Sequence, residues 1–181
     1  MYKLIAEQPF NLLRWFSVLS LATVVIASVV TSVFLSRFLS EHMLRRDAEV
    51  TMDFVQSVAK VQKAAEYFAG RRQSDKNWEE FFDHLDGLAD VLRVNAYDKE
   101  YKIIGSTDKS LEGKKFQDND ELDDAFKGKL AIGGGITSKD KMPKAEHMHL
   151  SDAPIQYVEN YVPIRDGAVG PVVGVVELYR T

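Results

Sequence analysis

The feature that most constrains this chain is an uninterrupted apolar stretch near its amino terminus. Residues 15–36 (WFSVLSLATVVIASVVTSVFLS) contain no Asp, Glu, Lys, Arg or His. As an α-helix these 22 residues would reach about 33 Å, more than the roughly 30 Å hydrocarbon core of a bilayer. A single segment inside a bilayer must satisfy its backbone hydrogen bonds internally, so the stretch is predicted to be a transmembrane helix. The alternative is a buried core helix.

The sequence on either side of this stretch bears on its type and orientation. A cleaved signal peptide has an apolar core of about 7–15 residues and a small-residue cleavage site. Here the apolar run is longer and passes directly into a helical pattern, which favours an uncleaved signal anchor. The positive-inside rule does not select a cytoplasmic amino terminus, because fewer basic residues precede the stretch than follow it. These residues are Lys3 and Arg14 before it, and Arg37, Arg45, Arg46 and Lys60 after it.

Composition limits what the rest of the chain can be. The 181 residues carry 23 Lys and Arg against 27 Asp and Glu, a net charge of −4 that argues against a nucleic-acid partner. There is no cysteine, and therefore no disulfide, thiolate metal site or cysteine nucleophile. We expect a cytoplasmic stub at residues 1–14, the transmembrane helix at 15–36, a long membrane-proximal helix at 37–70 and one folded domain at 71–181.

The long helix is predicted because residues 36–69 contain neither Gly nor Pro, and Gly70 suits the position after a helix. It could continue the span as one helix. Apolar residues at helical spacing form a seam, and this seam either packs on the helix's own domain or pairs with a second copy in a homodimer. We favour the homodimer for the half nearer the membrane. The candidate dimer residues are Met43, Val50, Phe54, Val58 and Val61.

The remaining sequence predicts an α+β fold with a five-stranded antiparallel sheet flanked by helices. A helix capped by Ser74 or Asp75 carries an aromatic face, and a short helix is capped by Asp118 or Asn119. Strands are expected at 92–97, 101–106, 130–132, 155–164 and 172–179, the first two forming a hairpin. The glycines at 133–135 are expected to interrupt the third strand and to act as a hinge beside the long polar loop at 137–153.

Several kinds of catalytic or cofactor site are disfavoured by the sequence. The glycines at 133–135 are not followed by Lys-Ser/Thr or by a helix, so they do not form a phosphate-binding loop. His147 and His149 have the spacing of a strand metal pair but lack clear further ligands. No nucleophilic side chain occurs in a recognisable sequence pattern with a general base. We therefore expect no catalytic residues, no cofactor and no metal.

Two strands carry polar residues at alternating positions. Arg93, Asn95 and Tyr97 share one face of the first strand, while Tyr157, Glu159 and Tyr161 share a face of the fourth. Polar residues commonly point to solvent from a half-exposed strand. If both faces of the sheet are covered, however, these side chains would line a small pocket.

These residues also carry a family resemblance. A membrane span and a long helix precede VNAYDKEYKIIGSTDKSLEGKKF (94–116) and VENYVPIRDGAVGPVVGVVELYR (158–180). This arrangement resembles the extracytoplasmic Cache-type, PAS-like sensor region of bacterial two-component histidine kinases, which also occurs in chemoreceptors and membrane diguanylate cyclases. The resemblance implies a cytoplasmic amino terminus, a periplasmic domain at the inner membrane and a five-stranded antiparallel sheet. It also implies a long helix on one face, often dimerising, and a small ligand beneath loops on the other.

Two functional hypotheses follow. In the first, the chain is a signal-sensing region whose kinase or other output module lies outside residues 1–181, which contain no phosphoacceptor or ATP-binding motif. In the second, it is a membrane-anchored structural or assembly protein that binds partners through the helix seam. For a sensor, the candidate ligand-binding residues suit a small organic acid or another anion. They are the cationic donors Arg93, Lys144, His147 and His149, with Asn95, Tyr97 and Tyr161.

Overall fold

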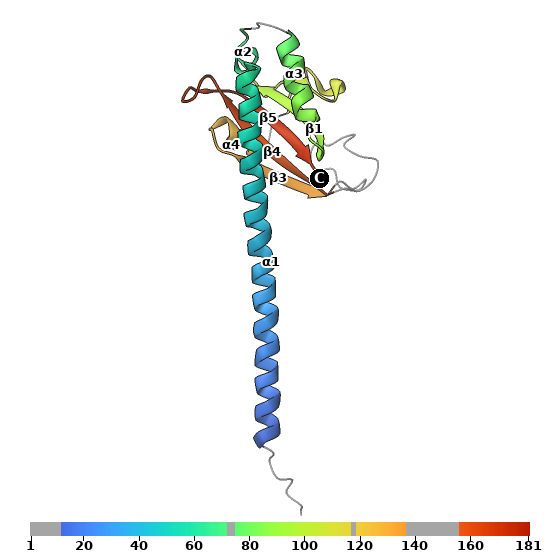
Figure 1. The fold of residues 1–181 in the computed structure, drawn as a ribbon, viewed down its shortest axis with the longest axis vertical. Coiled ribbons are helices and arrows are strands. Elements are labelled where there is room, and N and C mark those ends of the chain that lie inside the picture. Colours follow the sequence, from blue (N-terminus) through green and yellow to red (C-terminus); the bar gives the residue numbers. More distant parts are fainter. Residues whose placement is uncertain (1–11, 72–74, 117–118, 137–155) are drawn as a thin grey trace, which may run out of the picture. The chain divides into compact units, whose positions relative to one another are not determined.

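The computed structural model describes residues 12–71, 75–116, 119–136 and 156–181 (Figure 1). The chain is α+β, with a long amino-terminal helix followed by a five-stranded antiparallel sheet flanked by helices, as the sequence predicted. The helices are α1 (Leu12–Val61), α2 (Ala64–Phe68), α3 (Asp75–Asp86), the short 3-10 helix η1 (Lys109–Leu111) and α4 (Asp120–Phe126). The strands are β1 (Val91–Asp98), β2 (Ile103–Ser106), β3 (Ala131–Ile136), β4 (Gln156–Arg165) and β5 (Val172–Arg180).

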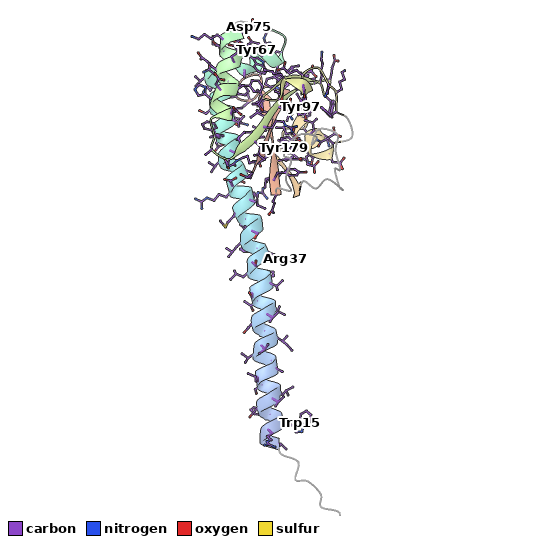
Figure 2. All side chains as sticks on the ribbon, turned by 90° about the vertical axis from the view of Figure 1, so that its right-hand side faces the viewer. Trp15, Arg37, Tyr67, Asp75, Tyr97 and Tyr179 are labelled. Atoms are coloured by element: carbon purple, nitrogen blue, oxygen red, sulfur yellow. The ribbon has the colours of Figure 1, made fainter. Side chains whose placement is uncertain are left out.

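The chain divides into two units, Met1–Leu44 and Arg45–Thr181. In the described part of the first unit the side chains of α1 are exposed, and Trp15 and Arg37 mark this stretch in Figure 2. Among the residues that the structure describes, the stretch of α1 from Arg14 is long and apolar enough to cross a membrane. The most apolar 18-residue window of this stretch has a mean hydropathy of 2.4, and none of its residues is buried inside the chain. By length and composition it is a candidate span, and a signal sequence meets the same criteria.

The second unit is organised around a sheet of strand order β2-β1-β5-β4-β3. Every neighbouring pair is antiparallel, and the last strand in sequence, β5, occupies the centre. All residues of β5 between its two ends are buried, so both faces of the sheet are covered there. One face is apolar and the other is largely polar.

The apolar face packs against α1, α2 and α3. Val55, Val58 and Ala59 of α1 join Val94 of β1 and Leu178 of β5 in one core cluster. In α3 the predicted aromatic face is confirmed, because Phe81, Phe82 and Leu85 are buried and Trp78 stacks on Tyr67 of α2 at 4.7 Å. The hydroxyl of Tyr67 also donates to Asp75 at the start of α3, at 3.1 Å (Figure 2).

The candidate dimer seam is divided by this packing. Val58 is 8% exposed and belongs to the core of its own domain. Val50 and Val61, by contrast, are 62% and 72% exposed, Phe54 is 37% exposed, and Met43 in the first unit is 70% exposed. Of the five seam residues, four are therefore accessible in the single chain.

The long helix ends earlier than the sequence predicted. α1 ends at Val61, and Lys63 adopts a left-handed conformation with φ of 53°. The short helix α2 then runs from Ala64 to Phe68. No Gly or Pro marks this break, which explains why sequence periodicity does not reveal it. The break redirects the chain so that Phe68 packs over Gly174 of β5, where any Cβ would overlap the ring. Gly70, with φ of 71°, ends the helical region as predicted.

Arg180, the last residue of β5, forms hydrogen bonds with α1 and with the residue that precedes β1. Its Nη1 donates to Asp47 Oδ2 at 2.6 Å and to Thr51 Oγ1 of α1. Its Nε donates to Asp90 Oδ2, just before β1, at 2.9 Å, and Nη2 contacts the same oxygen. Because the Arg180 side chain is only 15% exposed, these charge-assisted hydrogen bonds are partly shielded from water. The carboxyl end of the central strand is thereby tied to α1.

The second face of the sheet carries η1 and α4. Leu111, Leu122 and Ala125 from these helices pack on Ile103 and Val175. Asn119 rather than Asp118 is the amino-terminal cap of α4, because its side-chain oxygen accepts the Leu122 amide at 3.0 Å.

The predicted break at residues 133–135 is wrong. β3 runs through all three glycines and pairs continuously with β4, from Ala131 opposite Tyr161 to Ile136 opposite Gln156. Two of the glycines are needed because β4 approaches so closely. A Cβ at Gly133 would stand 2.6 Å from Glu159 Oε2, and one at Gly134 would stand 2.8 Å from the Tyr157 carbonyl. The glycines make room for a strand and for its side chains.

Gly105 of β2 offers a test of the packing beneath α3. A Cβ there would stand 2.8 Å from Phe82 Cε2 and 2.9 Å from Trp78 Cζ2. Gly105→Ala should lower the free energy of unfolding by about 1–3 kcal/mol, measured by chemical denaturation, because overpacking a filled core costs about that much. Phe82→Leu removes the overlap with Phe82 but not the one with Trp78, so the double variant should lose less than the two single losses added together. Strictly additive losses would contradict this account.

Candidate functional site

Polar side chains from five elements converge on the face of the sheet opposite α1. Arg93, Asn95 and Tyr97, which alternation predicted on one face of β1, share this face with Tyr157, Glu159 and Tyr161 of β4. The register shows why: Asn95 lies opposite Glu177 of β5, and Glu177 lies opposite Tyr161. Each of these seven side chains, Glu177 included, is at most 3% exposed. We call the set the buried polar cluster; its members are Arg93, Asn95, Tyr97, Ser106, Asn119, Tyr157, Glu159, Tyr161, Glu177 and Tyr179.

Glu177 is the centre of one half of this cluster. Its Oε2 accepts hydrogen bonds from Asn95 Nδ2 and from the Tyr97 hydroxyl, both at 2.8 Å. Ser106 of β2 donates to Asn95 Oδ1 at 2.7 Å, so the amide is oriented with its nitrogen toward the carboxylate. Three neighbouring strands thus hold a carboxylate that is fully buried. Such a group is tolerated in an interior only when its hydrogen bonds compensate for lost water.

Glu159 anchors the other half and connects the sheet to α4. The Tyr161 hydroxyl donates to Glu159 Oε2 at 3.0 Å and accepts from Asn119 Nδ2 at 3.0 Å. Asn119 uses its remaining side-chain atom to cap α4 through the Leu122 amide. The first turn of α4 and the carboxylate in β4 therefore belong to one hydrogen-bonded chain.

Arg93 supplies the positive charge of the cluster. Its guanidinium lies over the Tyr179 ring, 5.3 Å from the centroid, a distance typical of a cation–π contact. Tyr157 adds a second ring 5.9 Å from that of Tyr179 (Tyr97 and Tyr179 are labelled in Figure 2). A guanidinium and two phenol rings therefore lie on the same face as the two buried glutamates.

The missing side chain at Gly133 creates space at one side of the cluster. The position that a Cβ would occupy is 2.6 Å from Glu159 Oε2 and 3.6 Å from Glu121 Oε1 of α4. Carboxylates from β4 and α4 therefore approach the same point above β3. Any larger residue at position 133 would displace one of them.

Burial and negative charge keep two of the tyrosines neutral. Desolvation is the main reason that the pKa of Tyr161 is raised, and the charges of Glu177 and Glu159 raise it further. The pKa of Tyr179 is raised for the same reasons, burial first and the charge of Glu177 second. Both phenols consequently keep their protons even above pH 10, where an exposed tyrosine ionises, and can act as hydrogen-bond donors.

The predicted ligand-binding residues fall into two groups. Arg93, Asn95, Tyr97 and Tyr161 are brought together within the buried polar cluster. Lys144, His147 and His149 lie outside the described residues.

Sequence reasoning did not select Glu177, Tyr179, Asn119 or Ser106 as site residues. A signal for the first two was present, because Glu177 and Tyr179 alternate with apolar residues in the segment VVELYR. Within the described ranges there is no group of three or more His, Cys, Asp or Glu side chains placed to hold a metal ion. The expectation of a metal-free, cofactor-free and non-catalytic chain stays a prediction.

Comparisons with protein-family models and with curated proteins find no match for this chain.

The raised tyrosine pKa values predict a loss of stability in alkali. Above about pH 10, the ordinary pKa of tyrosine, the unfolded chain loses phenolic protons that folded Tyr161 and Tyr179 retain. The free energy of unfolding should then fall by about 1.4 kcal/mol per pH unit for each of these residues, measured by denaturation between neutral pH and pH 11 or so. Tyr161→Phe and Tyr179→Phe should each make the slope shallower by that amount. An unchanged slope in both variants would contradict the assignment.

Proposed function

We propose that this chain is the extracytoplasmic, ligand-sensing region of a membrane-bound bacterial sensor protein whose output module, that of a two-component histidine kinase, lies outside these residues. The observation that carries the proposal is the buried polar cluster. It lies on the sheet face opposite α1, which is where the Cache-type resemblance leads us to expect a small ligand.

The energetics of the cluster support a functional role. Burying a carboxylate costs several kcal/mol of desolvation free energy unless hydrogen bonds and charges compensate. An apolar side chain of similar size would carry no such desolvation cost. Here Glu159 and Glu177 are 2% and 0% exposed. Glu159 accepts a hydrogen bond from the Tyr161 hydroxyl, and Glu177 accepts from the Asn95 amide and the Tyr97 hydroxyl. Convergent polar groups among aromatic rings are a feature of sites that recognise polar ligands.

Localisation forms part of the same proposal. The candidate span within α1 would anchor the chain in the inner membrane, and residues 45–181 would lie in the periplasm. The orientation rests on the resemblance, because the basic residues beside the span do not select it.

The ligand we propose is a small organic acid or another anion, held chiefly by Arg93. A guanidinium forms strong paired hydrogen bonds with a carboxylate. Because Glu159 and Glu177 lie on the same face, a ligand that also carries a hydroxyl or an ammonium group would match the described residues better than a simple anion. A ligand screen should therefore cover both kinds of compound.

This screen can be run on the full chain in detergent, by thermal unfolding with organic acids, amino acids, amines and metals. A ligand at about a hundred times its dissociation constant adds roughly 2.7 kcal/mol to the folded state and raises the melting temperature. Arg93→Gln should abolish the shift, while Arg45→Gln, whose side chain is 77% exposed, should leave it unchanged. A shift that survives Arg93→Gln would place the ligand elsewhere, and no shift with any compound would count against a sensory role.

We also propose a homodimer formed through α1, and the accessible seam residues favour it. Exposed apolar side chains at Val50 and Val61 continue the seam beyond the candidate span. The same observation favours the second candidate function, a membrane-anchored assembly protein that binds partners through this helix. The two functions differ in whether a ligand binds the buried polar cluster.

Cysteine crosslinking in membranes tests the dimer directly, because the chain has no native cysteine. Single cysteines at the exposed seam positions Met43, Val50 and Phe54 should form disulfide-linked dimers with helical periodicity, since the membrane holds the two helices in one orientation. Cysteines at Ala48 and Val55, which are 1% and 0% exposed, serve as buried controls and should not crosslink. Uniform or absent crosslinking would leave α1 without a dimer role.

A further inference from the structure

The chain contains two Asp-Gly sequences, Asp86-Gly87 and Asp166-Gly167. This dipeptide is chemically labile, because glycine has no side chain to hinder attack of its amide nitrogen on the carboxyl carbon of the preceding aspartate. All four residues are exposed. Solvent access therefore does not distinguish the two sequences, and a difference in their reactivity must come from how the fold holds the amide and the carboxylate.

Gly87 is held at the end of α3. Its amide donates to the Asp83 carbonyl at 3.0 Å, which continues the helical hydrogen-bond pattern by one residue. In a helix the amide N–H lies along the axis, whereas the side chain projects outward from it. The Gly87 nitrogen is therefore engaged and directed away from the Asp86 carboxyl group.

Gly167 lies in the loop that joins β4 to β5 (Figure 1). Its φ of 81° is in the left-handed region, which glycine adopts without strain, and beyond its chain neighbours no atom lies within 4 Å of the position that a Cβ would occupy. The amide of Gly167 forms no hydrogen bond with any residue in the described ranges. Val169 of the same loop is 98% exposed, so water surrounds this part of the chain. The Gly167 nitrogen can therefore turn toward the Asp166 side chain.

The Asp166 carboxylate is held in place by Arg71. Both of its oxygens accept from Arg71 Nη2, at 2.9 Å and 2.8 Å. The two side chains are 56% and 41% exposed, so water competes with this ion pair. The pair consequently restrains the carboxylate and favours its ionised form, which is the less reactive one toward an amide nitrogen, but it does not prevent the reaction.

We propose that Asp166 is a site of spontaneous isomerisation to isoaspartate, that Asp86 is protected by its helix, and that Arg71 slows the reaction at Asp166. In the first step the Gly167 nitrogen bonds to Cγ of the protonated Asp166 carboxyl group. The hydroxyl of that group leaves with the amide proton as water, which closes a five-membered succinimide ring. In the second step water opens the ring at either carbonyl, so that one product is aspartate and the other isoaspartate. Water is the only co-reactant, and the proposal does not depend on a ligand binding the buried polar cluster.

Isoaspartate at position 166 would alter the contact between this loop and the helices. The side-chain methylene becomes part of the main chain, and the remaining carboxylate is attached directly to Cα. Arg71 follows α2 and Gly70, so its ion pair ties the end of the helical segment to the β4–β5 loop. A shortened and displaced carboxylate no longer meets Arg71 in the same place, and the tie is lost.

Peptide mapping by mass spectrometry tests the proposal on the full chain, aged in detergent at neutral pH. Isoaspartate appears as a peptide of unchanged mass and altered elution, and the succinimide as a peptide lighter by one water. Both products are expected in the peptide that contains Asp166 and not in the one that contains Asp86. A sample aged in denaturant should form them at both positions, because the helix no longer holds Gly87. Equal modification of the two sites in the folded chain, or no product at Asp166, would overturn the proposal.

Matched variants separate the roles of the groups at this site. Arg71→Gln should speed product formation at Asp166 about two- to fivefold, the factor that corresponds to an exposed ion pair. Asp166→Glu should abolish the products at this position, because its longer side chain does not close the five-membered ring. Asp86→Glu is the matched control and should leave the rate at Asp166 unchanged. An unchanged or slower reaction in Arg71→Gln would overturn the protective role of Arg71.

Discussion

The central strand β5 sets the organisation of the whole domain, because both of its faces are buried. Alternate side chains of β5 must therefore suit two different interiors. Val176 and Leu178 enter the apolar core beneath α1, whereas Glu177 and Tyr179 enter the buried polar cluster. A one-residue shift in register would move the carboxylate into the apolar core and the leucine into the polar cluster. The pairing of β5 with β1 and β4 is consequently strongly specified.

Several groups of the polar interior hydrogen-bond to one another across different elements. Glu177 is held from β1, and Glu159 is held through Tyr161 by Asn119 at the start of α4. Removing one member would leave another buried and unsatisfied, which costs more than the hydrogen bond itself contributes. The same networks make the cluster sensitive to any molecule that adds or removes a charge there. These polar side chains thus contribute to the structural specificity of the sheet.

The sequence allowed the sheet and its two faces to be predicted, because alternation in β1 and β4 is visible without any structure. It did not reveal which residues meet across the sheet, since Asn95 and Glu177 are far apart in the chain. The glycines of β3 misled the prediction, because their role depends on Glu159 approaching from the neighbouring strand. The break at Lys63 was also missed. The conformation there is left-handed, but the residue is neither Gly nor Asn, so the sequence carries no signal of it.

The strand that completes the sheet is also the last to be synthesised. In the order β2-β1-β5-β4-β3, the first hairpin and the β3–β4 pair meet only through β5. Until residues 172–180 are available, the chain holds two separate pieces of sheet with unpaired edges facing each other, and Arg180 cannot reach Asp47 and Thr51. The sheet is therefore completed only after residues 172–180 have been translated, and until then its unpaired strand edges can pair with other strands.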